Sequence, residues 1–275
     1  ALFGSEPAQS LQTPMAICTD NNQRLFIADT TAHVVHVMDL DTRAYARWAP
    51  VGRPMQSPVG LAYDAANRRL FVADSQAAAI YIFDSTGKFT GELASGQIKR
   101  PCGMAIDPKT GRIFVADVGA HQVVVLSPAG DVLQRIGARG DALGQFNYPT
   151  NVALDRQGRL YVSDSLNFRV QQFGPDLRPI RQIGRQGDMP GYFAQPKGVA
   201  VDPDGHVYVI DSQFEAMQIF DDTGALLLNI GEQGSAPGEF WLPTGIFIDT
   251  HGRIWVADSF NHRVQVFDYL PEGQS

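Results

Sequence analysis

The chain has 275 residues, of which 44% are hydrophobic and 19% are charged, as is ordinary for a soluble globular protein. Its formal net charge of −7 argues against nucleic acid as the main partner. No apolar run reaches the roughly 18 residues that a membrane-spanning helix needs, and all-β chains of this length often fold as one domain.

A repeated segment begins at each of six prolines. In chain order the copies are PMAICTD at Pro14, PVGLAYD at Pro58, PCGMAID at Pro101, PTNVALD at Pro149, PKGVAVD at Pro196 and PTGIFID at Pro243. The prolines are spaced by 44, 43, 48, 47 and 47 residues. A second segment follows in each unit, from IADTTAHVVHVMD at Ile27 to VADSFNHRVQVFD at Val256. The repeats start near residues 14, 58, 101, 149, 196 and 243, and they organise residues 1–275 as a single domain.

Each unit contains short apolar runs that are rich in Val, Ile and aromatic residues, which is typical of β-strands. Turn sequences such as DPKTGR at Asp107 and DTHGR at Asp249 separate the first run from the second. A fourth run follows another turn, as in SPAGDVLQRIG from Ser127. The period predicts an all-β fold, a six-bladed β-propeller with four antiparallel strands per blade.

The last unit lacks a fourth run before the chain ends at Ser275. Phe3 and Gly4 stand before Pro14 as Ile136 and Gly137 stand before Pro149. We therefore expect residues 1–4 to complete blade 6 and to close the ring, which would hide an exposed strand edge. We also expect a removed signal peptide and an extracytoplasmic location, secreted or periplasmic, while a cytoplasmic location stays open.

The pattern Asp-Ser-x-Asn-x-Arg-Val-x-x-Phe is nearly complete at 164–173 and 258–267, and it resembles the NHL repeat family. This resemblance implies a six-bladed propeller and is silent on chemistry. We interpret the polar residues as blade architecture: Asp258 ties the turn after the second strand, Asn261 adopts the left-handed conformation, and Arg263 pairs with a neighbouring blade.

The residues directly after the six prolines should surround the mouth of the central channel. They are Met15, Val59, Cys102, Thr150, Lys197 and Thr244. In amidating lyases with similar repeats, zinc-binding histidines follow such prolines, and in six-bladed lactonases acidic residues and Asn hold calcium. No histidine or carboxylate occupies this ring, and Lys197 would repel a cation. We expect no metal and no cofactor, and no disulfide between Cys18 and Cys102.

A second ring of equivalent positions contains His33, His121 and His262. These are either solvent-facing loop residues or a metal or pH-sensitive contact, and the sequence leaves both readings open.

Further candidates for a ligand site lie beside the first ring. They are the polar Asn151, the cationic Arg53 and Arg100, and the loop aromatics Tyr148, Tyr192 and Trp241. Exposed aromatics beside arginines suit a protein or peptide partner, and a small anionic ligand is a second option.

No nucleophile elbow or phosphate loop is present. We therefore predict a non-catalytic, monomeric binding scaffold that acts through the channel-mouth face. The alternative is a metal-dependent lyase or hydrolase with its site at the central channel.

Overall fold

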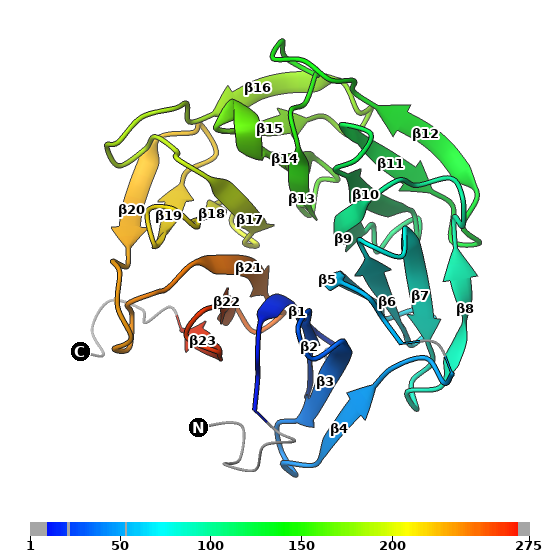
Figure 1. The fold of residues 1–275 in the computed structure, drawn as a ribbon. Helices are drawn as coiled ribbons and strands as arrows, with labels where there is room; N and C mark the ends of the chain where they lie inside the picture. The colour runs from blue at the N-terminus through cyan, green and yellow to red at the C-terminus, as the bar shows by residue number, and fades with distance from the viewer. Residues whose placement is uncertain (1–9, 21–22, 53, 269–275) are drawn as a thin grey trace.

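Six four-stranded or three-stranded antiparallel sheets stand around a central axis in the computed structural model, which describes residues 10–20, 23–52 and 54–268 (Figure 1). Neighbouring strands in each sheet are consecutive in the chain. The predicted six-bladed propeller is therefore confirmed.

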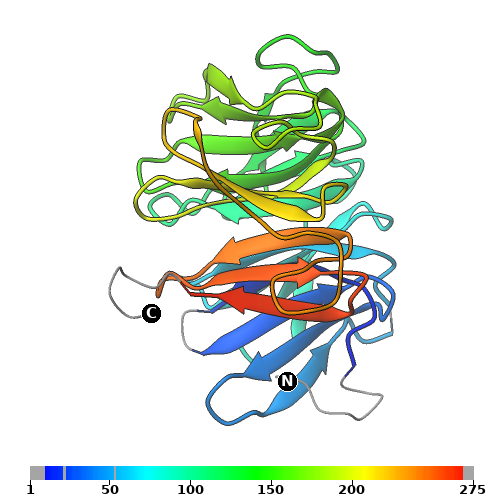
Figure 2. The ribbon, with the colours of Figure 1, turned by 90° about the vertical axis from the view of Figure 1, so that its left-hand side faces the viewer.

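The innermost strand of each blade begins at one of the six repeat prolines. These strands are β1 (Pro14–Thr19), β5 (Pro58–Asp64), β9 (Pro101–Ile106), β13 (Pro149–Leu154), β17 (Pro196–Val201) and β21 (Pro243–Ile248). Each one contacts the innermost strands of both neighbouring blades, and β1 meets β21 to complete the circle. The side-on view in Figure 2 shows blade 6 between blades 5 and 1.

The second strands are β2 (Arg24–Asp29), β6 (Arg69–Asp74), β10 (Ile113–Asp117), β14 (Leu160–Asp164), β18 (Val207–Asp211) and β22 (Ile254–Asp258). The third strands are β3 (Val34–Asp39), β7 (Ala79–Phe83), β11 (Gln122–Leu126), β15 (Arg169–Phe173), β19 (Ala216–Phe220) and β23 (Arg263–Phe267). The outermost strands are β4 (Tyr45–Trp48), β8 (Phe89–Leu93), β12 (Val132–Ile136), β16 (Pro179–Ile183) and β20 (Leu226–Ile230). A 3-10 turn, η2 (Ser165–Asn167), lies between β14 and β15.

The hydrophobic core is divided among the six junctions between blades. One cluster, for example, joins Phe26 of blade 1 to Tyr81 and Phe83 of blade 2, and another joins Leu25 of blade 1 to Trp255 of blade 6. The second strands are buried on both faces, because each is covered by a neighbouring blade on either side. Their continuous apolar runs follow from this double burial.

Blade 6 contains three strands within the described residues. Its outer strand β23 is half-exposed, whereas the equivalent β15 and β19 are buried along their whole length. The predicted closure by residues 1–4 lies outside the described residues and stays a prediction.

Candidate functional site

The blade aspartates are structural, as the repeat pattern predicted. The fully buried Asp164 carboxylate accepts hydrogen bonds from the Asn147 backbone N–H at 2.6 Å, Asn167 Nδ2 at 2.8 Å, Arg169 Nε at 2.9 Å and Gln171 Nε2 at 3.0 Å. It ties the loop leading into the blade to the turn between the second and third strands.

Two details of the predicted motif were wrong. The left-handed residue in the last blade is His262, with φ of 53°, because the Asn261 side chain instead donates to Gly234 O and to Asp258 Oδ2. The Arg263 guanidinium pairs with Asp258 at 2.7 Å and donates to carbonyls of the loop between blades 5 and 6, such as Ser235 O. It therefore fastens a loop and not the sheet of a neighbouring blade.

The residue after each blade aspartate faces the next blade. Hydroxyls at this position donate to the proline carbonyl that opens the next blade: Thr30 to Pro58 at 2.7 Å, Ser212 to Pro243 at 2.5 Å, and Ser165 to Pro196. These contacts place the hydroxyls beside the first ring, at the channel mouth.

The mouth holds a cavity of about 520 Å³, within the roughly 300–1,000 Å³ usual for small-ligand sites. All six residues that follow the prolines line it. Asn151, Arg100 and Tyr148 also line it, so the structure brings nine of the twelve candidates together.

The other three candidates do not contribute to this lining. The Tyr192 hydroxyl accepts a hydrogen bond from Arg185, whose guanidinium lies 4.6 Å from the tyrosine ring centre. Trp241 is 47% exposed and packs against Phe260, with ring centres 5.9 Å apart. Arg53 lies outside the described residues.

Sequence reasoning missed part of the lining. The further residues are Thr30, Ser57, Ser75, Gly103, Val118, Ser165 and Leu166. Four of them, Thr30, Ser75, Val118 and Ser165, directly follow a blade aspartate. This equivalence in the repeat was the signal that could have found them.

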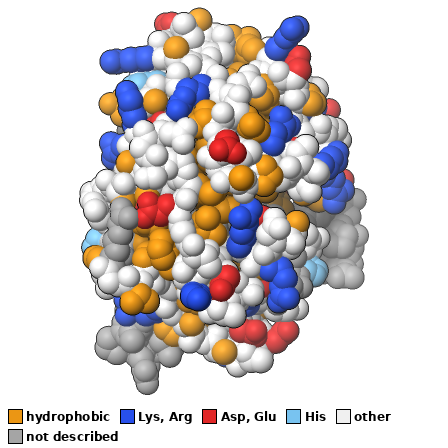
Figure 3. Space-filling model, turned by 90° about the vertical axis from the view of Figure 1, so that its right-hand side faces the viewer, with side chains coloured by type: hydrophobic (Ala, Val, Ile, Leu, Met, Phe, Trp, Pro, Cys, Tyr) orange, Lys and Arg blue, Asp and Glu red, His pale blue; other side chains and the backbone are white. Residues whose placement is uncertain are grey.

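Cations and hydroxyls supply the charge and much of the polarity of the mouth cavity. Its described lining contains Lys197 and Arg100 but no carboxylate and no histidine. By contrast, cationic and anionic side chains are interspersed over the outer surface shown in Figure 3. The mouth cavity therefore differs from that surface in carrying charge of one sign.

Lys197 is the central charge of this site. Burial lowers the pKa of its ammonium below the ordinary value, while Cys102 and Asp211 oppose that effect. Within the described part of the chain, its ammonium forms neither a hydrogen bond nor an ion pair. Such a cation is poorly solvated, so an anion that enters the cavity would gain a direct ion pair that the described residues do not supply.

The Cys102 thiol lies within the electrostatic influence of Lys197 and Arg100. Burial raises the pKa of its thiol, and the Ser75 hydroxyl, Arg100 and Lys197 act in the lowering direction. Both cysteines are free, as predicted. The two cations therefore act on the same point of the cavity wall.

The three ring histidines lie apart and take no part in a shared cluster. His121 Nδ1 accepts a hydrogen bond from the Tyr148 backbone N–H at 3.2 Å, and His262 Nδ1 contacts Gln12 O. Glu215 occupies the same position in blade 5 and accepts from the Leu242 N–H at 2.5 Å. In these blades, the residue at this position therefore contacts the loop before the innermost strand of the next blade. His33, at the same position in blade 1, is exposed.

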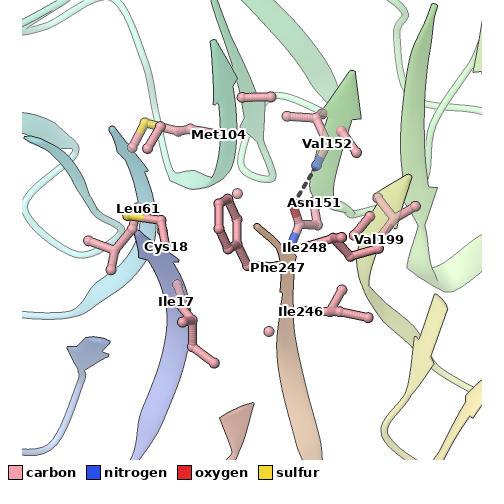
Figure 4. Close-up of a pocket in the computed structure, with 18 of the residues that line it drawn as sticks. Ile17, Cys18, Leu61, Met104, Asn151, Val152, Val199, Ile246, Phe247 and Ile248 are labelled. Atoms are coloured by element: carbon pink, nitrogen blue, oxygen red, sulfur yellow. Dashed lines mark hydrogen bonds between the residues drawn. The ribbon is translucent and has the colours of Figure 1, made fainter. Parts of the chain in front are cut away.

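A second cavity of about 260 Å³ runs along the innermost strands. Apolar side chains from five different blades line it, among them Ile17, Leu61, Met104, Val199 and Ile246 (Figure 4). It shares Val59, Gly103 and Asn151 with the mouth cavity, so the two spaces meet there.

Neither cavity offers a metal site among the described residues. Their linings include no histidine and no carboxylate, and the lone thiols Cys18 and Cys102 belong to different cavities. The one compact group of suitable side chains in the described part is Asp202, Asp204 and His206. It forms a turn on the opposite face, where His206 holds Asp202 at 2.8 Å as Arg159 holds Asp155 in blade 4.

Three family models match parts of the chain. The NHL repeat matches residues 146–173, the SMP-30/gluconolactonase/LRE-like region matches residues 46–154, and a six-bladed beta-propeller family matches residues 202–271. No curated protein matches the chain. Together with the six sheets, these matches make the chain an NHL-repeat six-bladed β-propeller.

Solved structures share the fold at low sequence identity. An auxiliary nutrient binding protein from Bacteroides thetaiotaomicron has a TM-score of 0.75 and 14% identity over 94% of this chain and 69% of that one. A gluconolactonase from Xanthomonas campestris has a TM-score of 0.72 and 18% identity over 96% and 87%. Virginiamycin B lyase from Staphylococcus aureus has a TM-score of 0.67 and 12% identity over 95% and 86%. These neighbours include enzymes and binding proteins, so they show the fold alone.

Proposed function

We propose that this propeller is a non-catalytic binding protein that holds a small organic anion in the mouth cavity. The observation that carries the proposal is the half-buried ammonium of Lys197, which forms no ion pair with any described residue, in a cavity lined by a second cation, Arg100.

The sequence favoured a protein or peptide partner, and the geometry shifts the preference to a small ligand. Of the loop aromatics proposed as anchors, only Tyr148 lines the cavity. The enclosed volume of about 520 Å³ suits a small molecule. If a peptide binds through its terminal carboxylate more tightly than a free carboxylate such as acetate does, a peptide partner would be favoured again.

The alternative is a metal-dependent lyase or hydrolase at the channel. The match of residues 46–154 to the gluconolactonase-like region favours it. The histidines and carboxylates that such chemistry needs are missing from the described linings of both cavities. Elemental analysis of the purified protein discriminates between the two, because a stoichiometric, tightly held zinc or calcium would support the enzyme.

The described residues include no helix long and apolar enough to cross a lipid bilayer. Nothing in the geometry bears on the predicted extracytoplasmic location or on the monomeric state, which stay predictions.

Anion binding can be tested with sodium acetate and sodium phosphate, each compared with sodium chloride at equal ionic strength. A ligand that binds only the folded state raises the melting temperature as its concentration exceeds Kd. We expect acetate to raise the melting temperature of the natural chain and to lose that effect in Lys197→Met. Lys88→Met removes an exposed lysine on another turn and serves as the matched control. Equal responses of the two variants would overturn the proposal.

A further inference from the structure

The mouth cavity meets a second cavity, whose lining side chains are mostly apolar. Val59, Gly103 and Asn151 line both cavities. Four blades have glycine two residues after the proline, at Gly60, Gly103, Gly198 and Gly245. Blade 4 has Asn151 there, whose Oδ1 accepts from the Val152 N–H at 2.7 Å. Asn151 thus places a polar side chain where the mouth cavity meets the inner cavity.

The glycines of this ring bring the innermost strands close together. A Cβ added to Gly103 would lie 2.4 Å from Asn151 Oδ1, and one added to Gly245 would lie 2.4 Å from Met15 O. The strand backbones, the Asn151 amide and the Val59 side chain therefore bound the place where the two cavities meet.

Beyond this point, every blade contributes apolar side chains to the lining. Two residues further along each strand, five blades carry a small residue: Cys18, Ala62, Ala105, Ala153 and Ala200. Blade 6 carries Phe247 at this position, and Figure 4 shows its ring reaching into the cavity. Phe247 is thus the one large side chain at these six equivalent positions, and Tyr63 is the other aromatic residue of the lining.

From this arrangement we infer that the ligand is an amphiphilic anion whose head pairs with Lys197 and Arg100 while a linear apolar tail passes Asn151 into the channel beside Phe247. The simplest member of the class is a straight-chain carboxylate of medium length. The inference rests on the proposed anion site and adds the channel to it. The physical reason is that the channel removes apolar surface from water, while the head keeps its charge in a cavity whose described lining carries only cations.

The test is a calorimetric titration with sodium acetate, butanoate, hexanoate and octanoate, below their micelle concentrations and at one ionic strength. Each buried methylene should tighten binding about fourfold. We expect the gain to continue with chain length and to stop when the channel is filled. Acetate binding without any gain for longer chains would overturn the amphiphile while leaving the anion site standing. Failure of acetate and of all longer chains to bind would overturn both.

Two variants locate the tail. Phe247→Ala enlarges the channel and should extend the chain length at which the gain stops. Ala105→Phe places a second ring at the equivalent position and should shrink the ratio of octanoate to acetate affinity severalfold. Ile180→Ala, which truncates an exposed apolar residue of β16, is the control and should leave that ratio unchanged. If neither channel variant alters the ratio of octanoate to acetate affinity, the tail lies elsewhere and the inference fails. If Ala105→Phe does not fold, the result for Phe247→Ala alone decides between these outcomes.

Discussion

The Ser259 hydroxyl donates to the Pro14 carbonyl at 2.6 Å, a hydrogen bond between residues 245 positions apart. Thr244 Oγ1 lies 2.7 Å from the same hydroxyl and 3.2 Å from Met15 O. This small network joins the last blade to the first where β21 meets β1. It repeats what Ser212 does between blades 5 and 6. The ring is thus closed at the mouth by the same contact that joins consecutive blades.

Removing this hydroxyl should destabilise the fold. Ser259→Ala removes the donor at 2.6 Å from the Pro14 carbonyl and leaves the Thr244 hydroxyl at 3.5 Å as its side-chain donor, and losing such a hydrogen bond costs about 1 kcal/mol. Ser75→Ala is the matched change in blade 2, where the hydroxyl has a longer hydrogen bond, 3.3 Å from Arg100 Nε. Urea unfolding of both variants should show the larger loss for Ser259→Ala. Equal losses would mean that the hydroxyl is not a special closure contact.

The buried carboxylate of Asp164 should matter more than any hydroxyl. Asp164→Ala would leave the Arg169 guanidinium, which is 5% exposed, without its anionic partner. Breaking a buried ion pair from one side costs about 3–5 kcal/mol. Asp176→Ala removes the anion of a largely exposed pair with Arg178 and should change stability little. A small effect of Asp164→Ala in chemical unfolding would contradict the structural role of the motif.

The repeat made most of this architecture predictable, because six copies in phase constrain strand order and spacing together. Each innermost strand begins at its predicted proline, and the residues after these prolines meet at one cavity. Side-chain orientation could not be predicted in the same way. Tyr192 was placed at the site by its loop, but its contact with Arg185 keeps it out of the lining. Likewise, Asn261 was assigned the left-handed turn from residue preference, while its amide is engaged by Asp258 and Gly234.

The channel was harder to foresee than the mouth. Its lining consists of consecutive residues of the innermost strands, and several of them, such as Leu61 and Met104, also belong to the core, so the apolar pattern alone cannot tell a packed residue from one facing a cavity. Phe247 looks in sequence like any strand aromatic, and only the ring of small residues at the equivalent positions makes it distinctive.

The proposed anion binding should depend on pH through Lys197. Because burial lowers the pKa of this ammonium below 10.5, the cation is lost at a lower pH than for an exposed lysine. Anion affinity is therefore full at pH values below the lowered pKa and falls as pH rises through it. Calorimetric titration with butanoate from pH 7 upward should give a midpoint below 10.5, and Lys197→Met should remove this pH dependence. A midpoint at or above the ordinary lysine value would argue that another cation binds the ligand.

The Cys102 thiol offers an independent readout of the same charge. Burial raises its pKa, and Lys197 acts against that rise, so replacing Lys197 should raise the pKa further. Since the thiolate is the reactive form, alkylation of Lys197→Met by iodoacetamide should be slower at a fixed pH. The pH–rate profile should shift to higher pH, which separates the effect from a mere change in access. Cys18 is 2% exposed and has a strongly raised pKa from burial, so it should react far more slowly and serve as an internal reference. Octanoate in the mouth cavity should protect Cys102 in the natural chain, whereas unchanged alkylation with saturating octanoate would place the bound anion away from Lys197.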